Sequence, residues 1–259
     1  MISASRIAAV AGNTVREAVR NRVLYTLVAF AVVMIGSSVL LSNLSYVEQG
    51  RILQDLAFAS ARIFGVVIAI AVGVNLIYKE VERRTIYTIL AKPISRFEFL
   101  VGKYLGLVAT IWLMVVVMGL AFAGVSLLDE RSLGWSHAAA LGLLGVELAV
   151  IVALATLFSA FTTPMLAALF TVGIWVAGNL TRDLLELARQ TGVEGIQNAA
   201  GALHRVLPDL AMFNLSLQAS HGLAIDPGSE VFLPLAYGAA YVAAVLCLAG
   251  LIFQRRDFR

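Results

Sequence analysis

Residues 104–128 read YLGLVATIWLMVVVMGLAFAGVSLL, a run that contains no charged side chain. A helix needs about 20 consecutive, mostly apolar residues to cross a bilayer, so this run predicts a membrane span. The whole chain agrees, because 60% of its 259 residues are hydrophobic and only 14% are charged. Soluble domains are about half apolar and about a quarter charged. The composition therefore predicts a membrane protein.

Further runs of suitable length extend outward from this one. The other predicted spans are residues 23–47, 57–78, 135–160, 164–181 and 231–253. Arg62 falls near one end of the second span, where its long side chain can reach the interface. We therefore expect an all-α polytopic membrane protein with six transmembrane helices in a single domain over residues 1–259. An even number of spans places both termini on the same side.

The basic residues predict which side that is. About two thirds of the 19 Lys and Arg residues fall in segments on the side of the N-terminus, and such segments face the cytoplasm. The first apolar run is longer than the apolar part of a secretory signal, and no small-residue cleavage site follows it, so we expect a retained span. These features predict a multi-pass protein of a bacterial inner membrane, with both termini cytoplasmic.

Residues 3–21 form an amphipathic helix on a helical wheel. Ile7, Ala11, Val15, Ala18 and Val19 fall on one side, and Arg6, Asn13, Arg16, Glu17 and Arg20 on the other. We expect an interfacial helix on the inner leaflet before the first span. The alternative is that these residues are simply the cytoplasmic start of that span.

The longest segment between spans, residues 182–230, is expected on the outer face. Apolar residues recur at helical spacing over 184–188 and again over 199–206. Pro208 interrupts this pattern, which resumes at 210–213. We expect short helices that pack on the outer membrane face or dip into it.

Residues 79–106 read KEVERRTIYTILAKPISRFEFLVGKYLG and mix charges of both signs with aromatic residues. Ile86, Ile89 and Leu90 lie at helical spacing, so residues 85–91 predict a short amphipathic helix. Pro93 stops it, because proline disfavours helix at the preceding residue. Residues 95–98 then read S-x-x-E, a capping box that starts a new helix. An apolar stripe between mixed charges predicts docking to another protein, although a plain basic loop would explain the Lys and Arg residues alone.

A family resemblance rests on this segment and on two others. Residues 82–85 (ERRT), 90–96 (LAKPISR) and 98–103 (EFLVGK) resemble the coupling segment of ABC-2 type permeases, the membrane subunits of ATP-binding-cassette exporters. Residues 207–215 (LPDLAMFNL) and 252–258 (IFQRRDF) resemble the stretches before and after the last span of these permeases. The branch most similar comprises permeases of multicopper-enzyme maturation, including the nitrous oxide reductase accessory permease. In many ABC-2 permeases a glycine stands where this chain has Arg84.

The resemblance implies a permease dimer that binds two cytoplasmic ATPase subunits through residues 79–99. The residues expected to dock the ATPase are Glu82, Arg83, Arg84, Thr85, Ile86, Ile89, Leu90, Lys92, Pro93 and Arg96. The chain has no G-x-x-x-x-G-K-[ST] phosphate loop, so we expect no catalytic residue here and ATP with magnesium on the partner. The chain itself is not expected to be an enzyme.

Glu147 falls near the middle of the fourth predicted span. A carboxylate at that depth is either functional or a paired residue that fixes helix packing, and the sequence names no partner for it. His137, His204 and His221 lack metal-ligand spacing, so no metal site is expected. Trp112, Trp135 and Trp175 are assigned to no binding site. The G-x-x-x-G pair Gly102 and Gly106 lies at a membrane edge, which weakens a dimerisation role.

The main hypothesis is that the chain is the permease subunit of an ABC-2 exporter and is surrounded by membrane lipids. An alternative is a membrane subunit that transports nothing and relays ATPase-driven motion to a periplasmic partner. A transport path would be lined by polar residues, and the spans contain few of them, so this alternative stays open. A secondary transporter is a third possibility, but it would show several ionisable residues at mid-membrane, and only Glu147 qualifies. Nucleic acid is not an expected partner, because no basic domain stands apart from the spans.

Overall fold

A computed structural model describes residues 4–20, 29–30, 32–33, 36–37, 49–82, 96–128, 134–191 and 193–255. Helices account for nearly all of these residues, and no strand occurs among them, which confirms the all-α class. The long helices are α3 (Gln49–Glu82), α5 (Arg96–Leu128), α6 (Trp135–Ser159), α7 (Pro164–Thr191) and α10 (Leu233–Arg255). The shorter ones are α1 (Ala4–Arg20), α8 (Glu194–Val206), η1 (Leu210–Phe213), α9 (Ser216–Ser220) and η2 (Pro227–Phe232).

Five helical segments of the described chain are long and apolar enough to cross a membrane. They are Arg51–Asn75, Phe97–Gly124, Trp135–Ser159, Pro164–Thr191 and Pro227–Ile252. Each corresponds to one predicted span, so these five predictions are confirmed as helices. The remaining predicted span, residues 23–47, lies outside the described residues apart from short helical pieces within 29–37.

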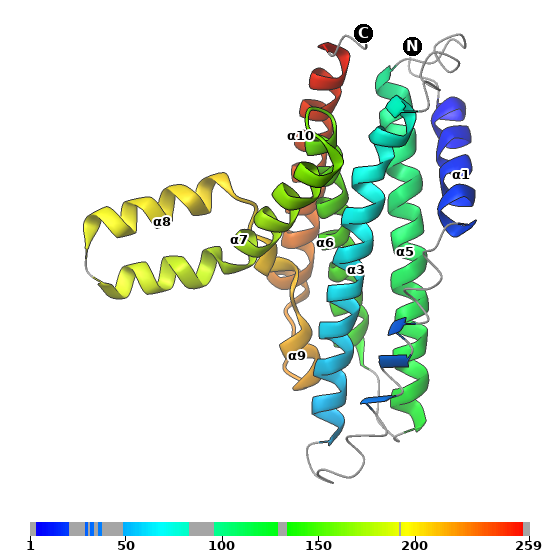
Figure 1. Cartoon of the computed structure of the whole chain (residues 1–259). Helices are drawn as coiled ribbons and strands as arrows, with labels where there is room; N and C mark the ends of the chain where they lie inside the picture. The colour runs from blue at the N-terminus through cyan, green and yellow to red at the C-terminus, as the bar shows by residue number, and fades with distance from the viewer. Residues whose placement is uncertain are drawn as a thin grey trace.

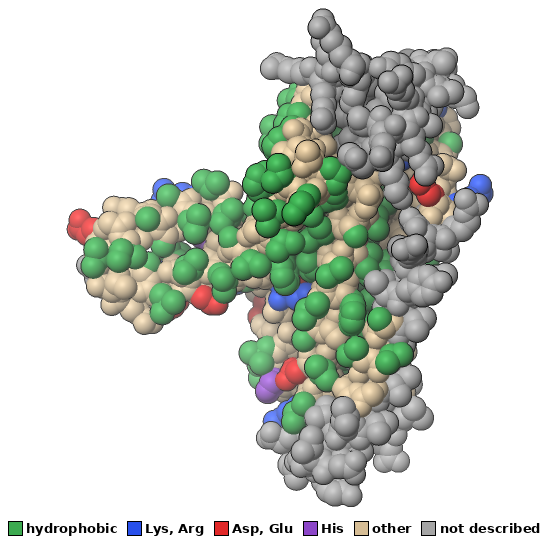
Figure 2. Space-filling view, in the orientation of Figure 1, with side chains coloured by type: hydrophobic (Ala, Val, Ile, Leu, Met, Phe, Trp, Pro, Cys, Tyr) green, Lys and Arg blue, Asp and Glu red, His purple; other side chains and the backbone are tan. Residues whose placement is uncertain are grey.

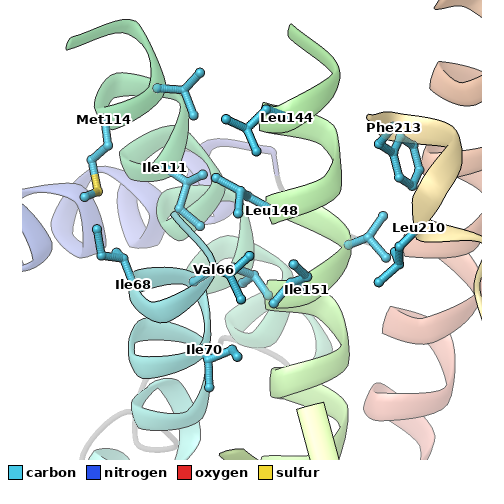
Figure 3. Packing of buried hydrophobic residues seen from close by; sticks show 14 of the residues in the cluster. Val66, Ile68, Ile70, Ile111, Met114, Leu144, Leu148, Ile151, Leu210 and Phe213 are labelled. Atoms are coloured by element: carbon cyan, nitrogen blue, oxygen red, sulfur yellow. The ribbon is translucent and has the colours of Figure 1, made fainter. Parts of the chain in front are cut away.

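Helix α6 occupies the centre of the bundle. It packs against α3, α5, α7 and α10, and Val150, Ile151, Val152 and Ala153 are completely buried. Because these four consecutive residues point in all directions around the helix, α6 is covered on every side, as expected of a helix that is apolar all round. Figure 3 shows side chains of α3 and α5 meeting those of α6 in this core.

Two further features of the fold follow from local sequence. Helix α5 begins at Arg96, directly after the serine of the predicted capping box. In Figure 1 the last turn of α3, the first turn of α5 and the last turn of α10 lie at the same end of the bundle. Residues 83–95, which include most of the predicted docking segment, lie outside the described residues.

Helix α7 differs from the prediction. It does not end at Thr181 but runs on to Thr191, and its second half pairs with α8 in an arm that projects sideways from the bundle (Figure 1). The predicted short helix at 184–188 is thus part of α7, because no proline or glycine interrupts it there and Ala188 is buried in the arm. The predicted span ends at Thr181 because charged residues, beginning with Arg182, are unfavourable in a membrane-spanning segment.

Much of the surface visible in Figure 2 is apolar, over the bundle and over the arm alike. Helix α8 has no buried residue, and Leu203 and Val206 are among its exposed apolar side chains. An apolar surface of this extent suits a protein that is surrounded by lipid rather than by water.

Helix α1 packs along α5, and the two glycines of the G-x-x-x-G pattern lie at the contact. A Cβ atom added to Gly102 would lie 2.9 Å from Cβ of Val10, and one added to Gly106 would lie 2.6 Å from the carbonyl oxygen of Ala11. Small residues allow helix backbones to approach this closely. The pattern therefore serves a contact within the chain, between the predicted amphipathic helix and α5.

We predict that Gly106→Ala loosens α1 from α5. The added methyl group has no room beside the Ala11 carbonyl, and overpacking of this kind costs about 1–3 kcal/mol. The midpoint of thermal unfolding in detergent, followed by tryptophan fluorescence, should fall. Gly124→Ala is the matched control on the same helix, because nothing lies within 4 Å of its added Cβ. If both variants unfold at the same temperature, the close contact does not stabilise the fold.

Candidate functional site

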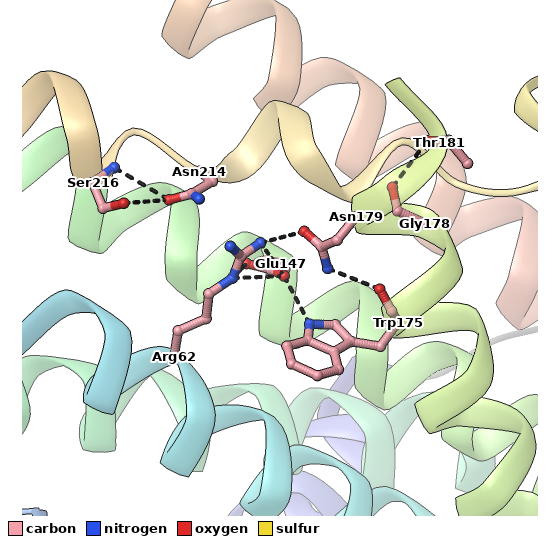
Figure 4. A network of polar contacts seen from close by, with 8 residues as sticks. All are labelled: Arg62, Glu147, Trp175, Gly178, Asn179, Thr181, Asn214 and Ser216. Carbon is pink, nitrogen blue, oxygen red and sulfur yellow. Dashed lines mark hydrogen bonds and ion pairs between the residues drawn. The ribbon is translucent and has the colours of Figure 1, made fainter. Parts of the chain in front are cut away.

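Glu147 lies in the middle of α6 and is completely buried. Its carboxylate is met by the guanidinium of Arg62, which comes from α3. Nε of Arg62 donates to Oε2 at 3.0 Å and Nη2 donates to Oε1 at 2.8 Å, so the contact is bidentate (Figure 4). Bidentate pairs of this kind are among the strongest side-chain contacts in proteins and fix geometry as well as charge.

Two side chains of α7 complete the arrangement around the ion pair. The indole N–H of Trp175 donates to Oε1 of Glu147 at 3.2 Å. Oδ1 of Asn179 accepts a hydrogen bond from Nη2 of Arg62 at 2.6 Å, while its amide nitrogen donates to the carbonyl oxygen of Trp175 at 2.8 Å. The second bond holds the Asn179 amide with its oxygen towards Arg62. Three helices, α3, α6 and α7, are thus joined at one polar centre.

The physical reason for this centre is the cost of a charge in an apolar interior. An isolated ionised group there is strongly disfavoured, so buried charges are paired and hydrogen-bonded. Here the side chain of Arg62 is 19% exposed and that of Glu147 is 1% exposed. Trp175 and Asn179 supply the additional hydrogen bonds that make such a pair tolerable.

The structure corrects the expectation that Arg62 reaches out to the membrane interface. The apolar segment of α3 begins at Arg51 rather than at Ala57, so Arg62 lies well inside it. Its side chain turns inward to Glu147 instead. The sequence held a usable signal, because one arginine and one glutamate isolated in separate spans are expected to pair. Trp175 and Asn179 gave a second indication, because they lie one turn apart and so place two hydrogen-bonding side chains on the same face of α7.

A cavity of about 400 Å³ lies beside the ion pair. It is bounded by α3, α6, α7 and the segment 213–217, and both Arg62 and Glu147 line it. Asp55 and Asn214 stand at exposed positions of its lining, whereas Glu147 is buried at its closed end. The cavity lies nearer the Gln49 end of α3 than the Glu82 end, and so away from the predicted docking segment.

The stretch 207–215 is held against α7 and α10 by further polar contacts of Asp209. Asp209 accepts a hydrogen bond from Nε of Arg182 at 2.7 Å, and its backbone N–H donates to the hydroxyl of Tyr237 at 3.1 Å. A Cβ atom added to Gly178 would lie 2.6 Å from the carbonyl oxygen of Pro208, so only glycine allows this approach. These contacts place the segment that follows over the cavity.

The other predicted site residues are placed as follows. Glu82 is the last residue of α3 and Arg96 the first of α5, and the rest of the docking set lies outside the described residues. Within the described part of the chain, no group of three or more His, Cys, Asp or Glu side chains is arranged to hold a metal ion. The structure therefore brings together Glu147 with Arg62, Trp175 and Asn179, of which only Glu147 was predicted as a site residue.

The family of the chain follows from a comparison with known families. A family model described as "ABC-2 family transporter protein" matches residues 8–258, nearly the full length. The chain belongs to the ABC-2 transporter family. No curated protein matches it. As an ABC-2 transporter protein it is a membrane component of transport rather than a catalytic chain, and five described helices that are long and apolar enough to cross a membrane agree with that role. The branch suggested by the sequence stays a prediction.

We predict that Arg62→Met destabilises this ABC-2 protein strongly. Removing one partner of a buried ion pair leaves an uncompensated charge and costs about 3–5 kcal/mol. The double variant Arg62→Met with Glu147→Met should recover most of the loss, since no charge is then left unpaired. Thermal unfolding in detergent measures both. Arg189→Met, at an exposed position in the arm, is the control and should change little. A double variant as unstable as the single one would contradict the pairing.

Proposed function

We propose that this chain is the membrane-spanning permease subunit of an ABC exporter in the inner membrane of a bacterium. In this proposal two copies of the chain assemble with two ATPase subunits, which bind on the side where both termini lie. The single observation that supports it best is the family match over residues 8–258. ATP and magnesium would be bound by the ATPase subunits alone.

The geometry of α3 and α5 supports a coupling role for residues 79–99. Helix α3 ends at Glu82 and α5 begins at Arg96, at the same end of the bundle (Figure 1). Both helices are long and pack against α6. A displacement imposed at this end would therefore be carried along two stiff elements towards the middle of the bundle, where α3 holds Arg62 opposite Glu147.

Docking itself is inferred from the sequence of the segment. We infer that Ile86, Ile89 and Leu90 fill a groove of the ATPase subunit, while Arg83 and Arg84 with neighbouring charges set the register. Buried apolar side chains at the centre of an interface contribute more than charges at its rim. The proline at 93 and the helix that begins at Arg96 would keep this short element distinct from α5.

The arm formed by α7 and α8 favours the relay function as a second candidate. It projects sideways from the bundle (Figure 1), and within the described chain its outer helix packs mainly against α7. A periplasmic protein that holds this arm would receive motion through α7, which also bears Trp175 and Asn179. The cavity beside Arg62 favours transport instead, because a transporter needs a cavity that admits its substrate, whereas a relay of motion does not.

The docking proposal predicts that Ile86→Asp together with Leu90→Asp releases the ATPase subunit. Each groove-filling side chain is worth about 2 kcal/mol or more at such a contact, so the double change should lower the affinity by more than about a hundredfold. Pull-down of the ATPase from detergent-solubilised membranes measures this, and the amount of inserted permease is checked in the same sample.

Arg83→Glu is the comparison variant for that experiment. As a change of rim charge it should weaken assembly only moderately, and the loss should grow smaller at high salt. If the double aspartate variant retains its partner and still stimulates ATP hydrolysis, residues 79–99 are an ordinary basic loop and the proposal is wrong.

A further inference from the structure

The cavity beside the ion pair has the dimensions of a small-molecule site. Its volume of about 400 Å³ falls within the range of roughly 300–1,000 Å³ that ligand pockets occupy. It combines a buried polar end at Glu147 with an exposed rim that includes Asp55 and Asn214. A ligand would therefore enter past the rim and reach inwards towards the ion pair.

The charges that line the cavity do not cancel. Three charged side chains face it, Asp55, Arg62 and Glu147. Arg62 and Glu147 neutralise each other in their bidentate contact, which leaves the carboxylate of Asp55. Asp55 lies two helical turns before Arg62 on α3, about 10 Å along the helix axis. It forms no hydrogen bond or ion pair with any residue that the structure describes, so the cavity has a net negative charge.

The hydrogen-bonding groups of the cavity show the same imbalance. Nε and Nη2 of Arg62 and the indole N–H of Trp175 all donate to Glu147 or Asn179. Among the guanidinium and indole donors, only Nη1 of Arg62 makes no hydrogen bond to a residue that the structure describes. The acceptors are less occupied, because neither oxygen of Asp55 accepts a hydrogen bond from a described residue and Oε2 of Glu147 accepts one hydrogen bond. A ligand that brings donors and positive charge would match this lining.

The walls of the cavity are mainly apolar and aromatic. Phe58, Trp175 and Phe213 line it from three different elements, together with aliphatic side chains such as Leu144. Aromatic faces attract cations and also bind apolar groups. The lining therefore suits a molecule with a cationic head and an apolar body, and it is unsuited to an anion, which would meet the carboxylate of Asp55.

We propose that this cavity binds an amphiphilic organic cation, with its ammonium group at Asp55 and its apolar body against Phe58 and Trp175. As a statement about transported substrates the inference rests on the proposed permease function. Binding itself needs no ATPase, and the two can fail separately. Loss of the ATPase in the pull-down experiment tests docking, whereas the experiment below uses the permease chain alone.

The test compares three fluorescent probes with the full chain in lipid nanodiscs. Dansylcadaverine carries a primary ammonium group, its N-acetyl derivative is neutral, and dansyl aminohexanoate is an anion of similar size. Empty nanodiscs correct for partition into lipid. The ammonium probe should bind saturably and at least about tenfold more tightly than the neutral one, which is the effect expected of one favourable charge contact. The anion should bind most weakly.

Variants then locate the site. Asp55→Asn should remove most of the preference for the ammonium probe, and folding should be retained because this exposed side chain has no partner in the described chain. Asp183→Asn removes an exposed carboxylate outside the cavity and should leave the preference unchanged. Ala59→Trp, at an exposed lining position, should block binding of all three probes.

Several outcomes overturn the proposal. Equal affinities for the three probes would mean that the cavity does not select by charge. A preference that survives Asp55→Asn would place the cation elsewhere on the protein. Absence of saturable binding beyond that of empty nanodiscs would exclude the site altogether.

Discussion

The bidentate contact between Arg62 and Glu147 is the constraint around which the bundle is arranged. Both groups lie in segments that are otherwise apolar, and neither is stable there without the other. Apolar side chains pack against many neighbours and tolerate small slips along a helix axis. A directional pair does not, so it sets the axial register of α3 against α6. Trp175 and Asn179 extend the same register to α7.

Helix α7 connects this centre with the segment 207–215 and with the arm. Trp175, Asn179 and Arg182 follow each other at spacings of four and three residues, so they form one polar stripe on the helix. The first two meet the ion pair, and the third meets Asp209 in the segment that closes over the cavity. The arm is the continuation of the same helix. A rotation of α7 would therefore change the ion pair, the cavity and the arm together.

Much of the fold was predictable from the sequence, because a membrane span is specified by local composition. The five spans, the helix over residues 4–20 and the start of α5 after a capping box all depend on short stretches. The end of α7 was not predictable in this way, since its charged second half is helical for lack of any breaker and through pairing with α8. The site was half visible. Glu147 could be identified from the sequence, because a carboxylate in the middle of an apolar span is energetically unfavourable. Its partner Arg62 lies 85 residues away in the sequence, and only the packing of α3 against α6 brings the two together.

That separation has a consequence for how the protein is made. Arg62 is synthesised 85 residues before Glu147, and at a translation rate of roughly 5–20 residues per second the delay is about 4–17 s. During this time the arginine in the apolar segment of α3 has no counter-ion on α6. Trp175 and Asn179 follow later still. A lone arginine near the centre of a span costs about 2.5–3.5 kcal/mol on insertion scales, so α3 by itself is a weaker span until α6 supplies the counter-ion.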